Sequence, residues 1–253
     1  MAEKFQLKTR YQFAGIIEKR DRWQTLRSEL AARDRWERLL GPYWARQNCA
    51  LDAISDPNLG NSKDLEGARA LELQSHIAAA QMVMRFAEGK EALFSEDLLE
   101  IHRIMLAGIH PSAGSYRQRD MNSLGEGHEP TAAELVSPVV ENALGWFQSP
   151  SFAEMHEVEK AALMLIKLVD IQPFDEGNGK TLRLFSGFFL LKAGYPPAII
   201  PPDRAGQYAV AIHQALRLQT QPIIDLITEA VEHSLAYLLD EPAAPPKLTV
   251  LGS

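Results

Sequence analysis

The alternation of apolar and polar positions along this 253-residue chain has mostly the period of an α-helix. Between residues 154 and 170, Val158, Ala161, Leu165 and Val169 recur at helical spacing and form one broad apolar face. Alternating runs typical of strands are scarce. The pattern therefore predicts an all-α fold with at most one short hairpin, near residues 118–130. Further helical patterns lie within residues 12–48 and over about 65–87, 95–105, 132–148, 180–193, 204–218 and 221–239.

Breaks in this pattern predict three parts. Residues 1–61 are expected to form an N-terminal helical extension, and residues 62–239 a helical core. Residues 240–253 contain several prolines and few apolar positions, so they are predicted to form a flexible tail.

Composition narrows the class of protein. A hydrophobic fraction of 46% is typical of a globular chain, and a net charge of −7 argues against a nucleic-acid partner. Cys49 is the only cysteine, so an internal disulfide is excluded and a reducing compartment is expected. No apolar run reaches the ~18 residues of a membrane helix, and the first residues lack the apolar stretch of a signal peptide. We therefore expect a cytoplasmic protein without a membrane segment.

The segment with the most chemistry is Gln172-Pro-Phe-Asp-Glu-Gly-Asn-Gly-Lys-Thr-Leu-Arg183, which joins two apolar helical runs. Gly177 and Gly179 permit positive φ and a close approach of a ligand to the backbone. The helix that follows has free N–H groups at its first turn, which favour an anion. Lys180 and Arg183 lie three residues apart and share one face. The segment predicts a phosphate site, whereas a short Gly-Asn-Gly turn alone is also found in ordinary helix–turn–helix connections.

Two carboxylates precede this turn. Asp175 and Glu176 offer hard oxygen ligands beside the expected phosphate, as is usual where Mg²⁺ binds a nucleotide. The segment therefore also predicts a magnesium ion.

This segment resembles the signature of the Fic (Fic/Doc, or Fido) family, His-Pro-Phe-x-(Asp/Glu)-Gly-Asn-Gly-Arg-x-x-Arg. Two positions depart from it: Gln172 stands at the place of the catalytic His, and Lys180 at the place of the first Arg. The resemblance implies a Fic-like helical bundle with a short β-hairpin flap. It also implies transfer of AMP from ATP, with Mg²⁺, to a Ser, Thr or Tyr hydroxyl of a target protein. The matching residues are Pro173, Phe174, Glu176, Gly177, Asn178, Gly179 and Arg183.

The resemblance also assigns roles. It implies that Glu176 holds the metal and that the nucleotide phosphates bind at Gly177, Asn178, Gly179, Lys180 and Arg183. Residues 119–130 correspond to the flap, which receives an unknown target protein by strand addition. The flanking segments Ala113–Arg117 and His156–Ala162 resemble family segments in the same order, although Leu165 replaces a frequent histidine. A homo-oligomer is left open.

A second motif lies before the core. Ser62-Lys-Asp-Leu-Glu66-Gly67 resembles the inhibitory pattern of one family subclass, (Ser/Thr)-x-x-x-Glu-(Gly/Asn). In that subclass the Glu pairs with the second Arg of the signature, here Arg183, and blocks the γ-phosphate. The same residues also fit a capping box that opens a helix.

Gln172 changes the expected mechanism. An amide cannot take up a proton near neutral pH, and losing a general base lowers a rate by typically ~10²–10⁴. The sequence leaves open a weak adenylyltransferase, one using another base such as Asp175, a non-catalytic nucleotide- or protein-binding pseudoenzyme, and an altered version of an active enzyme. A plain helical interaction protein outside the family is disfavoured by the aligned motif.

Overall fold

The computed structural model describes residues 2–27, 29, 35–36, 39, 43–53, 64–125 and 128–240. Side chains are described throughout these ranges except at 2–11, 52–53, 64–66 and 68. The described residues form helices and connecting loops and contain no strand, which confirms the all-α prediction. Among them, no helix is both long and apolar enough to cross a bilayer.

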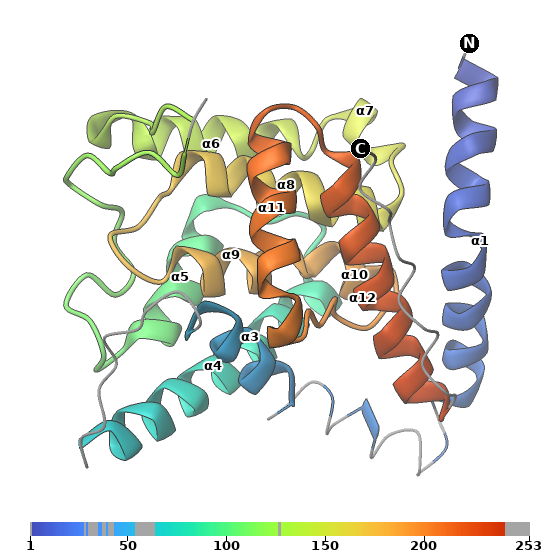
Figure 1. Ribbon diagram of the computed structural model, residues 1–253, viewed down its shortest axis with the longest axis horizontal. Coiled ribbons are helices and arrows are strands. Elements are labelled where there is room, and N and C mark those ends of the chain that lie inside the picture. The colour runs from blue at the N-terminus through green and yellow to red at the C-terminus, as the bar shows by residue number, and fades with distance from the viewer. Residues whose placement is uncertain are drawn as a thin grey trace.

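The helices follow the predicted pattern closely (Figure 1). The N-terminal ones are α1 (Ala2–Leu26), α3 (Trp44–Ala53), α4 (Asp64–Gly89) and α5 (Ser95–Leu106). The middle of the chain forms the 3₁₀ turn η2 (Ala133–Leu135), then α6 (Val136–Trp146), α7 (Pro150–Ala153) and α8 (Glu157–Ile171). The remaining elements are α9 (Asn178–Ser186), α10 (Phe188–Lys192), the 3₁₀ turn η3 (Pro202–Arg204), α11 (Ala205–Leu216) and α12 (Gln221–Leu239).

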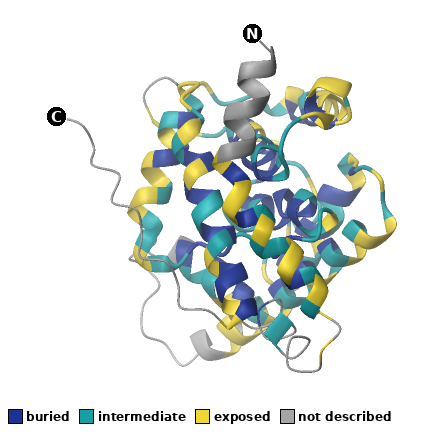
Figure 2. Ribbon diagram, turned by 90° about the vertical axis from the view of Figure 1, so that its right-hand side faces the viewer, coloured by how far each residue is buried: buried dark blue, intermediate teal, exposed yellow. Residues whose placement is uncertain are grey.

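Helix α8 is the centre of the core. It packs against α6, α9, α10, α11 and α12, and most of its side chains from Val158 to Ile171 are buried. A helix that is apolar nearly all round must be covered on all sides. Its start is fixed by a capping box, in which the Val158 N–H donates to His156 Nδ1 and the His156 N–H donates to Glu159 Oε2. Figure 2 shows the buried residues on the inward faces of the surrounding helices.

The N-terminal segment is docked onto this core. Helix α1 lies alongside α12 at one edge of the molecule (Figure 1). Phe13 stacks on the His156 ring at 4.0 Å, and Lys19 pairs with Glu232 at 2.9 Å. Trp23 and Trp44 are also buried. Of the predicted tail 240–253, all but Asp240 lies outside the described residues, as do residues 54–63.

Two local predictions were wrong. The helix expected over 180–193 is two helices, since α9 ends at Ser186 and α10 starts at Phe188, with Gly187 between them. The Gly187 N–H donates to the Leu184 carbonyl oxygen at 3.1 Å, a 3₁₀-type bond that ends α9.

The hairpin expected near 118–130 is not formed by the residues described there, 118–125 and 128–130. Backbone groups of this loop bond to side chains instead of to a facing strand. Ala133 N–H donates to Asp120 Oδ1 at 2.8 Å, and Leu124 N–H donates to His128 Nδ1 at 3.0 Å. These contacts replace a strand ladder.

Candidate functional site

The candidate site is the motif turn, residues 172–179, which joins the central helix α8 to α9. Gln172 ends α8 in the left-handed conformation, with φ 51° and ψ 65°. Its side chain is buried, and its Nε2 donates to the Val169 carbonyl oxygen at 2.9 Å. The amide therefore caps a carbonyl group of its own helix. Gln172, which stands at the place of the family's catalytic His, is thus bonded within its own helix.

Phe174 and His102 anchor the middle of the turn. The Phe174 ring is fully buried and stacks on the His102 ring of α5, with centroids 3.7 Å apart and planes 9° apart. Gly114 N–H donates to His102 Nδ1 at 3.0 Å, so the neutral ring carries its proton on Nε2, which donates to the Glu176 carbonyl oxygen at 3.1 Å. Burial lowers the pKa of His102 to about 4. His102 is thus a neutral residue that holds the turn in place.

Asn178 closes the turn from inside. Its Oδ1 accepts from the Phe174 N–H at 3.0 Å, and its Nδ2 donates to the Phe174 carbonyl oxygen at 2.6 Å. Gly177 before it has φ 75°, which favours glycine, and a Cβ there would lie 3.2 Å from the Leu106 side chain. The Asn178 side chain, predicted to contact a phosphate, is therefore used to hold the turn. The N–H groups at the start of α9 have no partner within the helix.

Arg117 ties the turn to the flap, the segment 119–130. This side chain is fully buried, and its Nε donates to the Gln172 carbonyl oxygen at 2.7 Å. Its Nη1 donates to the Arg119 carbonyl oxygen at 2.8 Å, and its Nη2 donates to that of Thr131. Its own backbone N–H donates to the Pro173 carbonyl oxygen at 3.0 Å. One guanidinium group therefore connects both ends of the flap to the start of the motif turn.

His128 fastens the flap at a further point. It is buried, and its Nδ1 accepts the Leu124 N–H. Its Nε2 therefore carries the proton of the neutral ring and donates to the Asp170 carbonyl oxygen of α8 at 2.9 Å. No pattern in the sequence points to this histidine, because its partners are backbone groups.

The two cations of the motif are engaged by the N-terminal helices. Lys180 Nζ forms an ion pair with Glu72 of α4. Arg183 Nε donates to Asn48 Oδ1 of α3, and Arg183 Nη2 donates to the Asn48 carbonyl oxygen at 3.0 Å. Asn48 Nδ2 also lies 3.2 Å from the Lys180 carbonyl oxygen. Residues from the N-terminal extension and from α4 thus complete the surroundings of both cations.

A buried histidine lies between these groups. His76 of α4 is fully buried, and its Nε2 lies 2.8 Å from Asn48 Nδ2. Burial, with the nearby charges of Arg183 and Lys180, lowers the pKa of His76 to about 3. The ring is therefore neutral at physiological pH, and its Nε2 accepts the Asn48 amide proton.

The structure describes only part of the predicted inhibitory segment 62–67. Ser62 and the side chain of Glu66 lie outside the described residues, so a Glu66–Arg183 pair stays a prediction. Gly67 is exposed on α4. Of the predicted site residues that the structure describes, those from Gln172 to Arg183 come together at one junction between α8 and α9.

The carboxylates fit a magnesium ion of the kind that keeps most of its water ligands. Glu176 is exposed, while only its carbonyl oxygen is used by His102. Asp175 is half-buried and lies 3.9 Å from the Arg119 guanidinium. The described residues hold no cluster of three or more His, Cys, Asp or Glu side chains that would bind a metal on its own. Mg²⁺ on a nucleotide needs only one or two carboxylates, because the phosphates supply further ligands.

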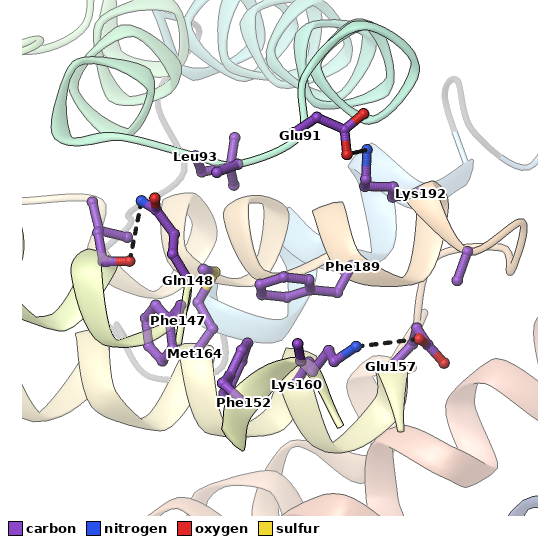
Figure 3. A pocket seen from close by; sticks show the side chains of 14 residues that line it. Glu91, Leu93, Phe147, Gln148, Phe152, Glu157, Lys160, Met164, Phe189 and Lys192 are labelled. Carbon is purple, nitrogen blue, oxygen red and sulfur yellow. Dashed lines mark hydrogen bonds and ion pairs between the residues drawn. The ribbon is translucent and has the colours of Figure 1, made fainter. Parts of the chain in front are cut away.

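A separate hollow of about 530 Å³ lies among α6, α7, α8 and α10 (Figure 3). Its lining combines apolar side chains, among them Phe152 and Phe189, with the ion pairs Glu91–Lys192 (3.2 Å) and Glu157–Lys160 (3.4 Å). None of the described residues that line it belongs to 172–183. It is therefore distinct from the motif turn.

Comparison with known proteins places this geometry in a family. Residues 92–190 match the Fic/DOC family, a range that includes the motif turn and α9. The chain is 30% identical over 175 residues to the protein adenylyltransferase Fic of Drosophila ananassae, an alignment that covers 68% of this chain and 35% of the relative. The chain thus spans about a third of the length of the curated relatives that it matches.

Solved structures agree on the fold. A Fic-1 fragment from C. elegans superposes with a TM-score of 0.72 at 21% identity, covering 94% of this chain and 74% of that one. A Fic domain containing signaling protein from Bacteroides thetaiotaomicron gives a TM-score of 0.73 at 19% identity, covering 90% and 99%. With its motif turn in register and this helical arrangement, the chain belongs to the Fic/DOC family, with the family domain in residues 92–190.

Proposed function

We propose that the chain binds a nucleotide at the motif turn. It resembles a protein adenylyltransferase whose activity is weak or absent because Gln172 stands at the place of the catalytic His. The observation that carries the proposal is the start of α9, where the left-handed Gly177 is followed by free N–H groups and by Lys180 and Arg183. A helix N-terminus with two nearby cations favours a phosphate. The relatives named protein adenylyltransferase support ATP as the nucleotide.

The residues of the turn have separate tasks in this proposal. The N–H groups of Gly177, Asn178 and Gly179 donate to phosphate oxygens, and Lys180 and Arg183 neutralise their charge. The exposed Glu176 carboxylate would hold Mg²⁺, which when bound supplies further positive charge to the phosphates. Arg117 and His102 keep the turn in one shape, so that these donors are preorganised.

Proton removal is the weak step. A target hydroxyl that attacks the α-phosphate must lose its proton, and the Gln172 amide cannot accept it near neutral pH. Asp175 is the carboxylate of the turn that could take this role, and its Oδ1 lies 3.9 Å from the Arg119 guanidinium. We expect transfer to be slower than with a histidine at position 172 by roughly 10²–10⁴.

A second candidate function is a non-catalytic nucleotide- or protein-binding module. The hydrogen bond from Gln172 to the Val169 carbonyl oxygen favours it, because this side chain serves helix capping. With either function, residues 119–130 receive a target protein. Residues 62–67 form an inhibitory segment in which Glu66 pairs with Arg183. Residues 1–61 form an extension of the 62–239 core, and residues 240–253 form a tail. A homo-oligomer is compatible with either function.

The two functions are separated by label transfer from α-labelled ATP with Mg²⁺. The parent chain is compared with Gln172→His, with Gln172→His/Lys180→Arg, and with the triple variant that adds Glu66→Gly. The enzyme reading predicts self-modification that rises along this series. Equal, near-zero transfer in the parent and the triple variant, with nucleotide still bound, would support the binding module instead. Robust transfer by the parent would show that the base has been assigned wrongly.

A further inference from the structure

Glu72 is an acidic residue placed directly on a cation of the motif. It belongs to α4, outside the residues 92–190 that match the family, and it pairs with Lys180 of α9. It lies six residues beyond Glu66, so the inhibitory pattern 62–67 does not include it. The side chains are 32% and 22% exposed, so the pair is partly shielded from water.

We propose that Glu72 is a specificity-determining residue. In the absence of a bound metal ion, its negative charge weakens the binding of ATP more than that of ADP, and that of ADP more than that of AMP. The inference rests on the proposed function, because it concerns the same phosphate site. The Glu72 carboxylate cancels the charge of one of two motif cations and repels a ligand in proportion to the ligand's own negative charge.

The other neighbours of the cations do not add positive charge. Asn48, which bonds to Arg183, is an uncharged amide. His76, which bonds to the Asn48 amide, is neutral at pH 7 because burial lowers its pKa to about 3. The same Asn48 amide bonds to Arg183 and to the Lys180 carbonyl oxygen, so both motif residues lie beside one side chain. With Glu72 ionised, Lys180, Arg183 and Glu72 together carry a single net positive charge. Without it they carry two.

The size of the effect follows from Coulomb's law. The Coulomb energy of two unit charges about 4 Å apart in water corresponds to about a five-fold change in a binding constant. Near a protein surface the same two charges interact more strongly. The repulsion grows with each phosphate added. It is also screened by salt, since the pair is partly exposed.

The test is calorimetric titration of AMP, ADP and ATP in EDTA, at low and high salt, with the parent and Glu72→Gln. We expect Glu72→Gln to tighten ATP binding by about five-fold at low salt, ADP binding by about three-fold and AMP binding by about two-fold, in proportion to their charges. The gain for ATP should shrink at high salt. Glu72→Asp, which keeps the charge, should retain the parental selectivity.

Glu232→Gln is the matched control. The Glu232–Lys19 pair has side chains 33% and 21% exposed, almost the same as Glu72–Lys180, but it joins α12 to α1. It should leave all three affinities unchanged. The comparison is repeated in a Glu66→Gly background, so that the inhibitory segment does not mask binding.

Two outcomes would overturn the inference while leaving the proposed function intact. One is nucleotide binding that is unchanged in Glu72→Gln. The other is an equal gain for AMP, ADP and ATP, or the same gain in Glu72→Asp, either of which would mean that Glu72 acts through packing. Absence of binding by every variant, with and without Mg²⁺, would overturn the proposed function and this inference together.

Discussion

The pH dependence of stability tests the buried histidine that holds the motif turn. His102 has a pKa of about 4 in the folded protein because of burial, against 6.5 for an exposed histidine. Protonation of Nδ1 would remove the acceptor of the Gly114 N–H inside the core. The unfolded chain therefore takes up this proton first as the pH falls. The stabilisation by neutral His102 is complete above pH ~6.5 and is lost as the pH falls toward ~4.

The magnitude follows from the two pKa values. A difference between 6.5 and about 4 corresponds to at most ~3 kcal/mol of unfolding free energy, of which ~2 kcal/mol is lost between pH 7.5 and pH 5. At its steepest, one histidine adds about 1.4 kcal/mol per pH unit to the slope of stability against pH.

The assay is urea unfolding at a series of pH values from 7.5 to 5, with the parent and His102→Gln. Glutamine can accept from Gly114 and donate to Glu176 as the neutral imidazole does, but it does not titrate. Between the two pKa values, the slope of unfolding free energy against pH should be lower in the variant by the equivalent of about one bound proton. His233→Gln, at an exposed position of α12, is the control and should keep the parental slope. Identical slopes for the parent and His102→Gln would refute the reasoning.

Three further predictions concern the same junction. Asn178→Ala leaves the buried N–H and C=O of Phe174 unpaired, so unfolding free energy should fall by about 2–4 kcal/mol in urea titrations; a loss below ~0.5 kcal/mol would contradict the role of this side chain. Arg117→Lys keeps the charge but loses the fork that reaches both flap ends, so hydrogen exchange of flap amides should accelerate while that of α12 amides stays constant; acceleration in α12 as well would indicate general destabilisation. Gln172→His should raise label transfer toward the ~10²–10⁴ gain of a general base, and Lys180→Arg should add to it; a decrease on adding Lys180→Arg would contradict the phosphate-binding role of this cation.

The helical fold was predictable because its evidence is local. Apolar residues at helical spacing in α8 require cover on several sides, and the surrounding helices provide it. His102 also lies on the buried, periodic face of α5, which is typical of a structural residue. The break at Gly187 was missed because a single glycine inside an apolar helical run is a weak signal. The break itself is a 3₁₀-type bond from the Gly187 N–H to the Leu184 carbonyl oxygen, which ends α9.

The surroundings of the motif cations could not be predicted in this way. Glu72 lies 108 residues before Lys180, and the Asn48 amide reaches the Lys180 carbonyl across 132 residues. No short-range pattern connects such positions, so only the packing of α3 and α4 on α9 brings them together. The role of Gln172 could also be predicted only in part. Its residue type excludes a general base, but its left-handed conformation and its bond to Val169 depend on how α8 ends.

Nucleotide binding at the start of α9 is the central claim, and calorimetric titration with ATP and Mg²⁺ tests it most directly. We predict measurable binding in a Glu66→Gly background and a loss of affinity on Arg183→Ala. Arg204→Ala is the control, because Arg204 pairs with Glu229 at 2.6 Å near α11 and should not affect the ligand. Absence of binding in the Glu66→Gly background, or equal affinity with and without Arg183, would contradict the claim.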